Sequence, residues 1–311
     1  MSEVEILSSV PPPQLSASHA EHSWMPSSPC GDRCIPRRSE SIRRIGLVVR
    51  AVLALFAIGL LPLLILIGLL WPGVRGGAAT VGARLLLTAV GIGLRVEDHR
   101  SDREASRTRN GSLVVAGHVS WADILVLTAI RPARFVARAD LVDWPLLGLL
   151  ARSMKVISID RGKLRALPET VGQVSATLRE GGSVIVFPEG TTWCGLAYGS
   201  FRPAMFQAAI DTETWVQPVR LRYVDTLRDR TTTSTCFVGD ETIGRSIGRI
   251  FRLKGIVAEV ALVAPQAPGN DRRDLARRCE ASIRAGDVHD RRLHSIVESA
   301  GVDPKATHVR S

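Results

Sequence analysis

Aromatic residues are scarce in this chain of 311 residues, which contains six Trp, two Tyr and seven Phe. Proteins that bind single-stranded nucleic acid commonly stack bases on aromatic rings, so this scarcity argues against a nucleic-acid partner. The basic residues are mostly Arg and are scattered, with clusters at residues 37–44 and 272–278. The net charge of +10 therefore favours an anionic membrane surface or a phosphorylated substrate.

Cysteine is also sparse, with five residues at irregular spacing, so we expect reduced thiols and no disulfide framework. Cys30 and Cys34 form a CxxxC pair in a Pro- and Ser-rich segment without a neighbouring His. This context predicts two exposed thiols and no metal site. Cys194 has no His in its local sequence, so it is not predicted to act as a nucleophile.

The amino-terminal part of the chain predicts a tail followed by a membrane element. Residues 1–42 are rich in Ser and Pro without a hydrophobic period, which predicts disorder. Residues 51–74 carry no charge, and an apolar run of this length can cross the hydrocarbon core as a helix. A signal peptide would instead carry its basic region near the start. Pro62 and further apolar residues at 78–94 fit a helical hairpin equally well, so residues 43–96 are predicted to anchor the chain.

Beyond a polar break at residues 97–110 the pattern changes to short apolar runs separated by helical segments. Residues 168–180 are typical of a helix, with a Pro at the start, a Gly pair after the end and apolar residues at helical spacing. The alternation predicts an α/β domain over residues 97–266, with a single mixed, largely parallel sheet flanked by helices. Sites in such folds gather at the carboxyl ends of strands. The expected strands are residues 113–116, 134–136, 156–159, 183–187, 215–221 and 257–263.

The carboxyl-terminal part, residues 267–311, is predicted to form a basic helix and a tail. Leu275, Cys279 and Ile283 lie on one face of this helix, and arginines surround the rest. We expect the helix to pack on the domain; contact with anionic lipid is the alternative.

Two polar segments follow expected strands. In the first, His118 comes directly after the strand at 113–116, and Asp123 lies in the first turn of the next helix if Ser120 is the N-cap. A carboxylate on one imidazole nitrogen fixes the tautomer, so that the other nitrogen can take a proton from an alcohol. In the second, the strand at 183–187 runs into a rigid turn at residues 188–192 with Pro, Gly and hydroxyl side chains.

Together the two segments resemble the glycerolipid (PlsC-like) 1-acylglycerol-3-phosphate acyltransferase family. Its signature is an HxxxxD block followed later by a Phe-Pro-Glu-Gly-Thr block, here His118 with Asp123 and then residues 187–191. A strand ending in Arg161 and a Gln-Pro-Val block at residues 217–219 match the family's other two blocks. The likeness covers residues 111–223. Gly117 departs from the pattern, since many relatives have Asn there.

The resemblance implies a role for each matching residue. His118 is the general base on the acceptor hydroxyl, and Asp123 orients it. The expected substrate-binding residues, which hold the phosphate and glycerol end of the acceptor, are Arg138, Arg161, Glu189, Gly190 and Thr191. Guanidinium groups suit this role because they bind phosphate in a bidentate fashion.

The implied reaction moves an acyl group from acyl-CoA or acyl carrier protein to the sn-2 hydroxyl of 1-acylglycerol 3-phosphate. The product is phosphatidate, and the enzyme would work in phospholipid biosynthesis at the cell membrane, with its catalytic domain on the cytoplasmic side. No metal, no cofactor beyond the acyl donor and no covalent intermediate are expected.

Three alternatives remain open. Residues 118–123 and 143–148 resemble the branch that acylates lyso-ornithine lipid, which would change the acceptor. A thioesterase would use water as the acceptor. A non-catalytic protein that binds anionic membranes would explain the charge and the apolar helix alone.

Overall fold

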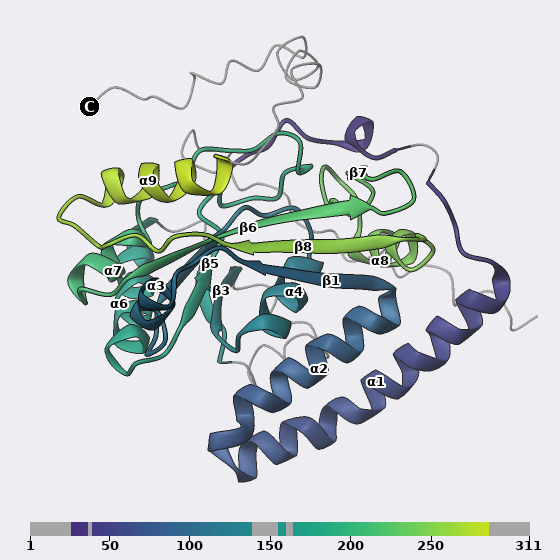
Figure 1. Cartoon of the computed structure of the whole chain (residues 1–311), viewed down its shortest axis with the longest axis horizontal. Coiled ribbons are helices and arrows are strands. Elements are labelled where there is room, and N and C mark those ends of the chain that lie inside the picture. Colours follow the sequence, from purple (N-terminus) through teal and green to yellow (C-terminus); the bar gives the residue numbers. More distant parts are fainter. Residues whose placement is uncertain (1–25, 37–38, 139–154, 160–163, 286–311) are drawn as a thin grey trace, which may run out of the picture.

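A computed structural model describes residues 26–36, 39–138, 155–159 and 164–285 (Figure 1). Residues 1–25 of the tail expected at residues 1–42, and residues 286–311 of the helix and tail expected at residues 267–311, lie outside these ranges. Within the described residues, the strands are β1 (Ile92–Asp98), β2 (Leu113–Ala116), β3 (Arg134–Arg138), β4 (Ile157–Ile159), β5 (Val184–Val186), β6 (Val216–Asp225), β7 (Arg230–Thr231) and β8 (Ile256–Leu262). The helices are α1 (Arg44–Leu70), α2 (Arg75–Val90), α3 (Asp102–Arg107), α4 (Ala122–Ile130), α6 (Leu167–Arg179), α7 (Phe206–Asp211), α8 (Ile243–Ile250) and α9 (Arg272–Arg284).

The strands form one mixed sheet in the order β1-β8-β6-β2-β5-β3-β4, with β7 paired to β6. Five neighbouring strands of the sheet run parallel to one another, namely β6, β2, β5, β3 and β4. Strand β8 pairs with β6 in the antiparallel sense, and β1 pairs with β8 in the parallel sense. The predicted fold class is therefore confirmed. Every expected strand overlaps an observed one, and the helix expected at residues 168–180 is α6.

Strand β1 differs from the sequence expectation. Residues 92–96, expected in the membrane-anchoring segment, belong to β1, which pairs with β8 at the edge of the sheet. Charged residues interrupt its apolar pattern, and an edge strand tolerates them because its side chains are largely exposed. Arg95 forms an ion pair with Glu259 of β8. The globular domain therefore begins before residue 97.

The two faces of the sheet pack against different helices, because successive side chains of a strand point to opposite faces. Val114 and Ala116 of β2 join a core that includes residues of α2 and α4. Leu113 and Val115 join a second core with residues of α6, α7 and α9 (Figure 1). Helix α9 thus packs on the domain as expected, with the predicted apolar face of Leu275, Cys279 and Ile283 buried.

Helices α1 and α2 lie side by side as a hairpin below the sheet, and α2 packs on α4 (Figure 1). Close approach is possible because a Cβ at Gly82 would already lie 3.2 Å from Leu61, so a larger residue would push the helices apart. Among the described helices, α1 is the one long and apolar enough to cross a membrane, with a mean hydropathy of 2.9. Only 11% of its most apolar stretch of 18 residues is buried, so most of its apolar side chains are not covered by protein.

The segment at residues 26–36, called the N-terminal segment below, also differs from the expectation of disorder. Cys30 is buried in the core on the α2 and α4 side, with Cys34 and Ile35 packed against that core. The expectation of two exposed thiols is therefore wrong. Sequence composition misses this packing because the partner residues come from distant parts of the chain.

Candidate active site

At the carboxyl edge of the sheet, the loop between β2 and α4 carries His118 and the first turn of α4 carries Asp123. Trp121 directly precedes α4, and the hydroxyl of Ser120 accepts a hydrogen bond from the backbone N–H of Ala122 at 3.3 Å, as expected of a residue that caps the helix. The carboxylate of Asp123 organises the loop that precedes the helix, because its Oδ2 accepts hydrogen bonds from the backbone N–H of Val119 (2.7 Å) and Ser120 (2.9 Å). These bonds wrap the loop around the carboxylate.

Asp123 is fully buried and pairs with the imidazole of His118, with 2.9 Å between Oδ2 and Nδ1. The hydroxyl of Tyr223 in β6 donates to Oδ1 at 2.7 Å. Burial and the Asp123 charge raise the pKa of Tyr223 well above its ordinary value, so the phenol keeps its proton and donates. A buried carboxylate requires such donors. The carboxylate of Asp123 accepts a hydrogen bond from the Nδ1–H of His118, and Nε2 is then the nitrogen that can accept a proton.

The turn after β5 lies directly against His118. The ring of Phe187 stacks on the imidazole with centroids 4.1 Å apart. Oε2 of Glu189 accepts a hydrogen bond from the backbone N–H of His118 at 2.9 Å. The chain then returns to the same residue, because Trp193 donates its backbone N–H to the carbonyl of His118 at 2.7 Å. His118 is therefore fixed at its backbone on both sides and at its ring.

Gly190 adopts a left-handed conformation with φ of 76°, which favours glycine. A Cβ at this position would lie 2.7 Å from Pro26 of the N-terminal segment. The backbone N–H of Gly190 donates to the carbonyl of Phe187 at 3.0 Å and closes the turn. Both the backbone conformation and the close packing of Pro26 therefore favour glycine at position 190.

Glu189 is buried, and burial raises its pKa to about 8. The backbone N–H of His118 and the charge of Arg284 act in the opposite direction, but burial dominates. A substantial fraction of the Glu189 side chains is therefore protonated at neutral pH. The protonated carboxyl has an O–H to donate in addition to accepting the His118 N–H.

This raised pKa predicts a pH-dependent stability. A carboxyl with a higher pKa in the folded state than in the unfolded state contributes stability at low pH that is lost as the pH rises. The melting temperature should therefore fall between the ordinary pKa of 4.5 and about pH 8. Glu189→Gln should flatten this fall in thermal unfolding scans. Glu180→Gln, at an exposed residue, serves as the control and should keep the wild-type slope; equal slopes for the wild type and Glu189→Gln would contradict the assignment.

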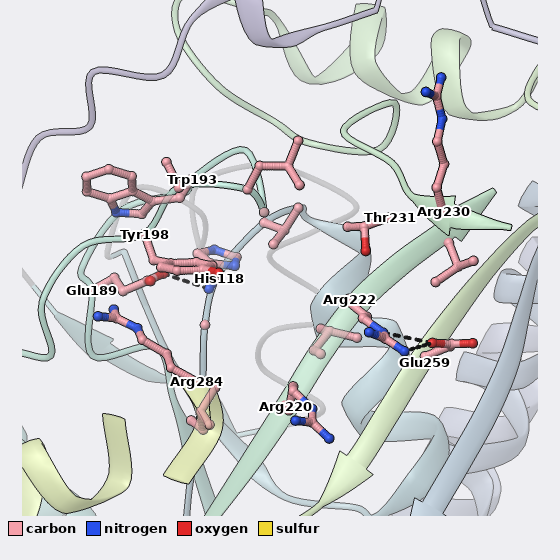
Figure 2. Close-up of a pocket in the computed structure, with 18 of the residues that line it drawn as sticks. His118, Glu189, Trp193, Tyr198, Arg220, Arg222, Arg230, Thr231, Glu259 and Arg284 are labelled. Carbon is pink, nitrogen blue, oxygen red and sulfur yellow. Dashed lines mark hydrogen bonds and ion pairs between the residues drawn. The ribbon is translucent and has the colours of Figure 1, made fainter. Parts of the chain in front are cut away.

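His118 and Glu189 open onto a cleft of about 260 Å³. Figure 2 shows Trp193, Tyr198 and Arg284 gathered around them. Other labelled residues that line the cleft come from β6, β7 and β8, namely Arg220, Arg222, Arg230, Thr231 and Glu259 (Figure 2). These four arginines outnumber the three acidic residues that line the cleft, Glu189, Asp229 and Glu259, and this excess of positive charge favours an anionic substrate group.

The four arginines differ in their partners. Arg222 pairs with Glu259 at 2.8 Å, and Arg284 pairs with Glu280 and lies over the Tyr198 ring. Among the described residues, the guanidinium groups of Arg230 and Arg220 have no hydrogen-bond or ion-pair partner; Arg230 is exposed, whereas Arg220 is half-buried in the cleft wall. Arg220 is thus both unpaired and partly enclosed. It is therefore the cleft arginine best placed to bind an anion without first breaking a protein contact.

The structure brings together part of the predicted site. His118, Asp123 and Glu189 form one hydrogen-bonded unit. Gly190 and Thr191 follow in the same turn but are not among the described residues that line the cleft. The backbone of Arg138 ends β3 at the carboxyl edge where β2 and β5 also end. Arg161 lies outside the described residues.

Tyr223, Arg220 and Arg284 were not predicted as site residues. Arg220 lies in the apolar run at residues 215–221, and Tyr223 lies just after it. In such a sequence context a tyrosine is expected to be a core residue and an arginine to be a surface charge. Arg284 belongs to the basic helix. A sequence signal exists only for Arg220, which directly follows the Gln-Pro-Val block. The contacts of all three depend on strand order and helix docking.

Comparison with known proteins shows which family the chain is similar to. The family model described as Acyltransferase matches residues 97–222. The 1-acyl-sn-glycerol-3-phosphate acyltransferase of Neisseria meningitidis is 35% identical over 216 residues, which cover 69% of this chain and 82% of that protein. The lyso-ornithine lipid O-acyltransferase of Pseudomonas aeruginosa is 32% identical over 180 residues, 57% of this chain and 67% of that protein.

A solved structure has the same fold. The crystal structure of the 1-acyl-sn-glycerophosphate acyltransferase PlsC from Thermotoga maritima matches with a TM-score of 0.56 at 18% identity, over 79% of this chain and 97% of that one. Fold and site together define an enzyme that transfers acyl groups to a lipid acceptor. The chain belongs to the glycerolipid acyltransferase family, so the resemblance seen in the sequence is confirmed.

Proposed function

We propose that the protein acylates the sn-2 hydroxyl of 1-acylglycerol 3-phosphate, with acyl-CoA or acyl carrier protein as the donor, to give phosphatidate. The observation that carries this proposal is the buried His118–Asp123 pair, which opens onto a cleft lined by arginines. A base beside a cationic pocket suits an acceptor with a hydroxyl near a phosphate. The names of the Neisseria relatives support the same acceptor.

The proposed mechanism is a direct transfer. Nε2 of His118 takes the hydroxyl proton while the acceptor oxygen attacks the thioester carbonyl. The new C–O ester bond forms and the C–S bond breaks. The thiolate leaves and takes a proton from the imidazolium, which restores neutral His118. Asp123 stays ionised and stabilises the imidazolium that forms between these steps. No side chain becomes acylated.

The acceptor's phosphate is proposed to bind Arg138 and Arg161, as the resemblance implies, together with Arg220 of the cleft. Glu189, Gly190 and Thr191 are proposed to hold the glycerol end. Glu189 also has a positioning role, because its carboxyl holds the backbone of His118. Since guanidinium groups bind phosphate through paired hydrogen bonds, losing one of them should weaken acceptor binding more than turnover.

The chain is proposed to sit at the cell membrane with the catalytic domain on the cytoplasmic side, where the thioester donors are. Residues 43–96 would provide the anchor, apart from the part of β1 that the structure places in the sheet. Residues 97–266 would form most of the catalytic domain, and residues 267–311 would add α9 and a tail. The exposed apolar side chains of α1 support this arrangement.

A lyso-ornithine lipid acceptor is the second candidate. Relatives named lyso-ornithine lipid O-acyltransferase, from Pseudomonas aeruginosa and Rhizobium meliloti, are 32% and 36% identical. Their acceptor contains no phosphate, so an acceptor panel separates the two candidates.

The test is to offer purified protein an acyl-CoA with lysophosphatidate, lyso-ornithine lipid or lysophosphatidylcholine, and to identify the lipid product by thin-layer chromatography. We expect phosphatidate, and CoA release only when the acceptor is present. Arg220→Ala should raise KM for lysophosphatidate several-fold with a smaller change in kcat. Arg103→Ala, at an exposed residue of α3 outside the cleft, is the matched control.

Three results would reject the proposal. Acylation of lyso-ornithine lipid alone would assign the second candidate. CoA release without any lysolipid would indicate a thioesterase. Binding to anionic liposomes without turnover of any acceptor would indicate a non-catalytic membrane protein.

A further inference from the structure

Three cysteines from two distant parts of the chain meet beside the active site. The sulfur atoms of Cys30, Cys34 and Cys194 all lie within 4.8 Å of one another. Cys30 and Cys194 are each 5% exposed, and Cys34 is half-buried. A short helical turn, Asp32–Cys34, closes the CxxxC pair, with the backbone N–H of Cys34 donating to the carbonyl of Gly31 at 2.9 Å.

This geometry points to a zinc site in which Cys30, Cys34 and Cys194 are the ligands. Zinc binds thiolate sulfur at about 2.3 Å in a tetrahedral arrangement, which places sulfur atoms about 3.8 Å apart. The three sulfurs are already close to this spacing. Binding releases the three thiol protons to solvent and forms three Zn–S bonds without any redox step. Thiolate ligands favour zinc over hard cations such as Mg²⁺ or Ca²⁺.

The fourth ligand of a tetrahedral zinc ion can be protein or water. Cys236 is fully buried in the same core as Cys30 and Cys194, although it is not within the tight group of three sulfurs. Its replacement therefore distinguishes a site with four thiolates from one with three thiolates and a water.

Apart from the packing of Cys30, Cys34 and Ile35 on the core, the described part of the N-terminal segment has few anchors on the domain. Its described contacts include a hydrogen bond from Thr233 to the carbonyl of Cys34 (2.6 Å) and the contact of Pro26 with Gly190. Gly239 also approaches Gly31 closely. A segment held by so few contacts gains order from a metal that cross-links it to the domain.

The zinc site would also act on the catalytic loop. Cys194 directly follows Trp193, whose backbone N–H holds the carbonyl of His118. Phe237 follows Cys236 and donates its backbone N–H to the carbonyl of Val119 at 2.9 Å. Zinc would therefore tie the N-terminal segment to the chain that positions His118, with a structural role and no contact with the substrate.

The experiment measures zinc in the full chain, purified in detergent from zinc-supplemented cultures, by mass spectrometry of the metal. We expect about one zinc ion per chain, retained through dialysis. Cys34→Ser and Cys194→Ser should each lose the metal. Cys279→Ser is the matched control, because Cys279 is an equally buried free thiol in the opposite core, and this variant should keep its zinc.

Two further measurements keep the test decisive if a variant folds poorly. Replacement of zinc by Co²⁺ in the wild-type chain should give the thiolate-to-cobalt absorption of a tetrahedral site. A strong chelator should lower the melting temperature of the wild type but not that of Cys34→Ser. Metal-free wild-type protein that fails to take up zinc or Co²⁺ would overturn the proposal. A disulfide among these cysteines in freshly purified protein, or equal zinc in Cys34→Ser and the wild type, would do so as well.

Discussion

Replacing His118 with alanine should lower kcat by about 10²- to 10⁴-fold, the usual contribution of a positioned general base. The imidazole lines the cleft and its Nδ1 is held by a fully buried carboxylate, so Nε2 is oriented to take the proton of the acceptor hydroxyl and this oriented base is lost in the variant. The measurement is the initial rate of CoA release with lysophosphatidate and a saturating acyl-CoA.

His99→Ala is the matched control for this prediction. His99 follows β1, its side chain is 52% exposed, it pairs with Glu97, and neither residue lines the cleft. This variant should keep wild-type turnover. Circular dichroism should confirm that His118→Ala remains folded, since the fixed backbone of the loop does not depend on the ring. Wild-type kcat in folded His118→Ala would remove the proposed base from the mechanism.

Replacing Asp123 with asparagine is expected to have the second largest effect, with a loss in kcat of about 10²-fold or more and little change in KM. The amide oxygen can still accept hydrogen bonds from the loop, but the negative charge that stabilises the imidazolium is gone. The same kinetic assay checks this result, with a thermal unfolding scan beside it to measure stability.

Tyr223→Phe provides the graded comparison for Asp123. It removes one neutral donor to Oδ1 and leaves the charge and the other three donors in place. The expected cost is about 0.5–1.5 kcal/mol of stability, with kcat within a few-fold of the wild type. If Asp123→Asn and Tyr223→Phe lowered kcat equally, the charge of Asp123 would have no special role in the transfer.

Much of this fold could be predicted because its signals are local. Each expected strand is a short apolar run, and α6 begins with a Pro and ends before a Gly pair, so neighbouring residues decide these elements. The edge strand β1 escaped prediction because exposed charges break its pattern.

The candidate site divides in the same way. The His118–Asp123 pair spans five positions across one strand–helix junction, so the sequence alone determined that these groups can meet. Glu189 reaches His118 across 71 positions, and Tyr223 reaches Asp123 across 100. Those contacts exist because β5 and β6 both lie next to β2 in the sheet.

The sequence by itself determined the class of fold, the apolar segment, the acid–base pair and the family. Only the tertiary structure decided the arginine-lined cleft, the raised pKa of Glu189 and the meeting of Cys30 with Cys194. The physical reason is that burial and long-range contact depend on strand order and helix docking, which many distant residues fix together.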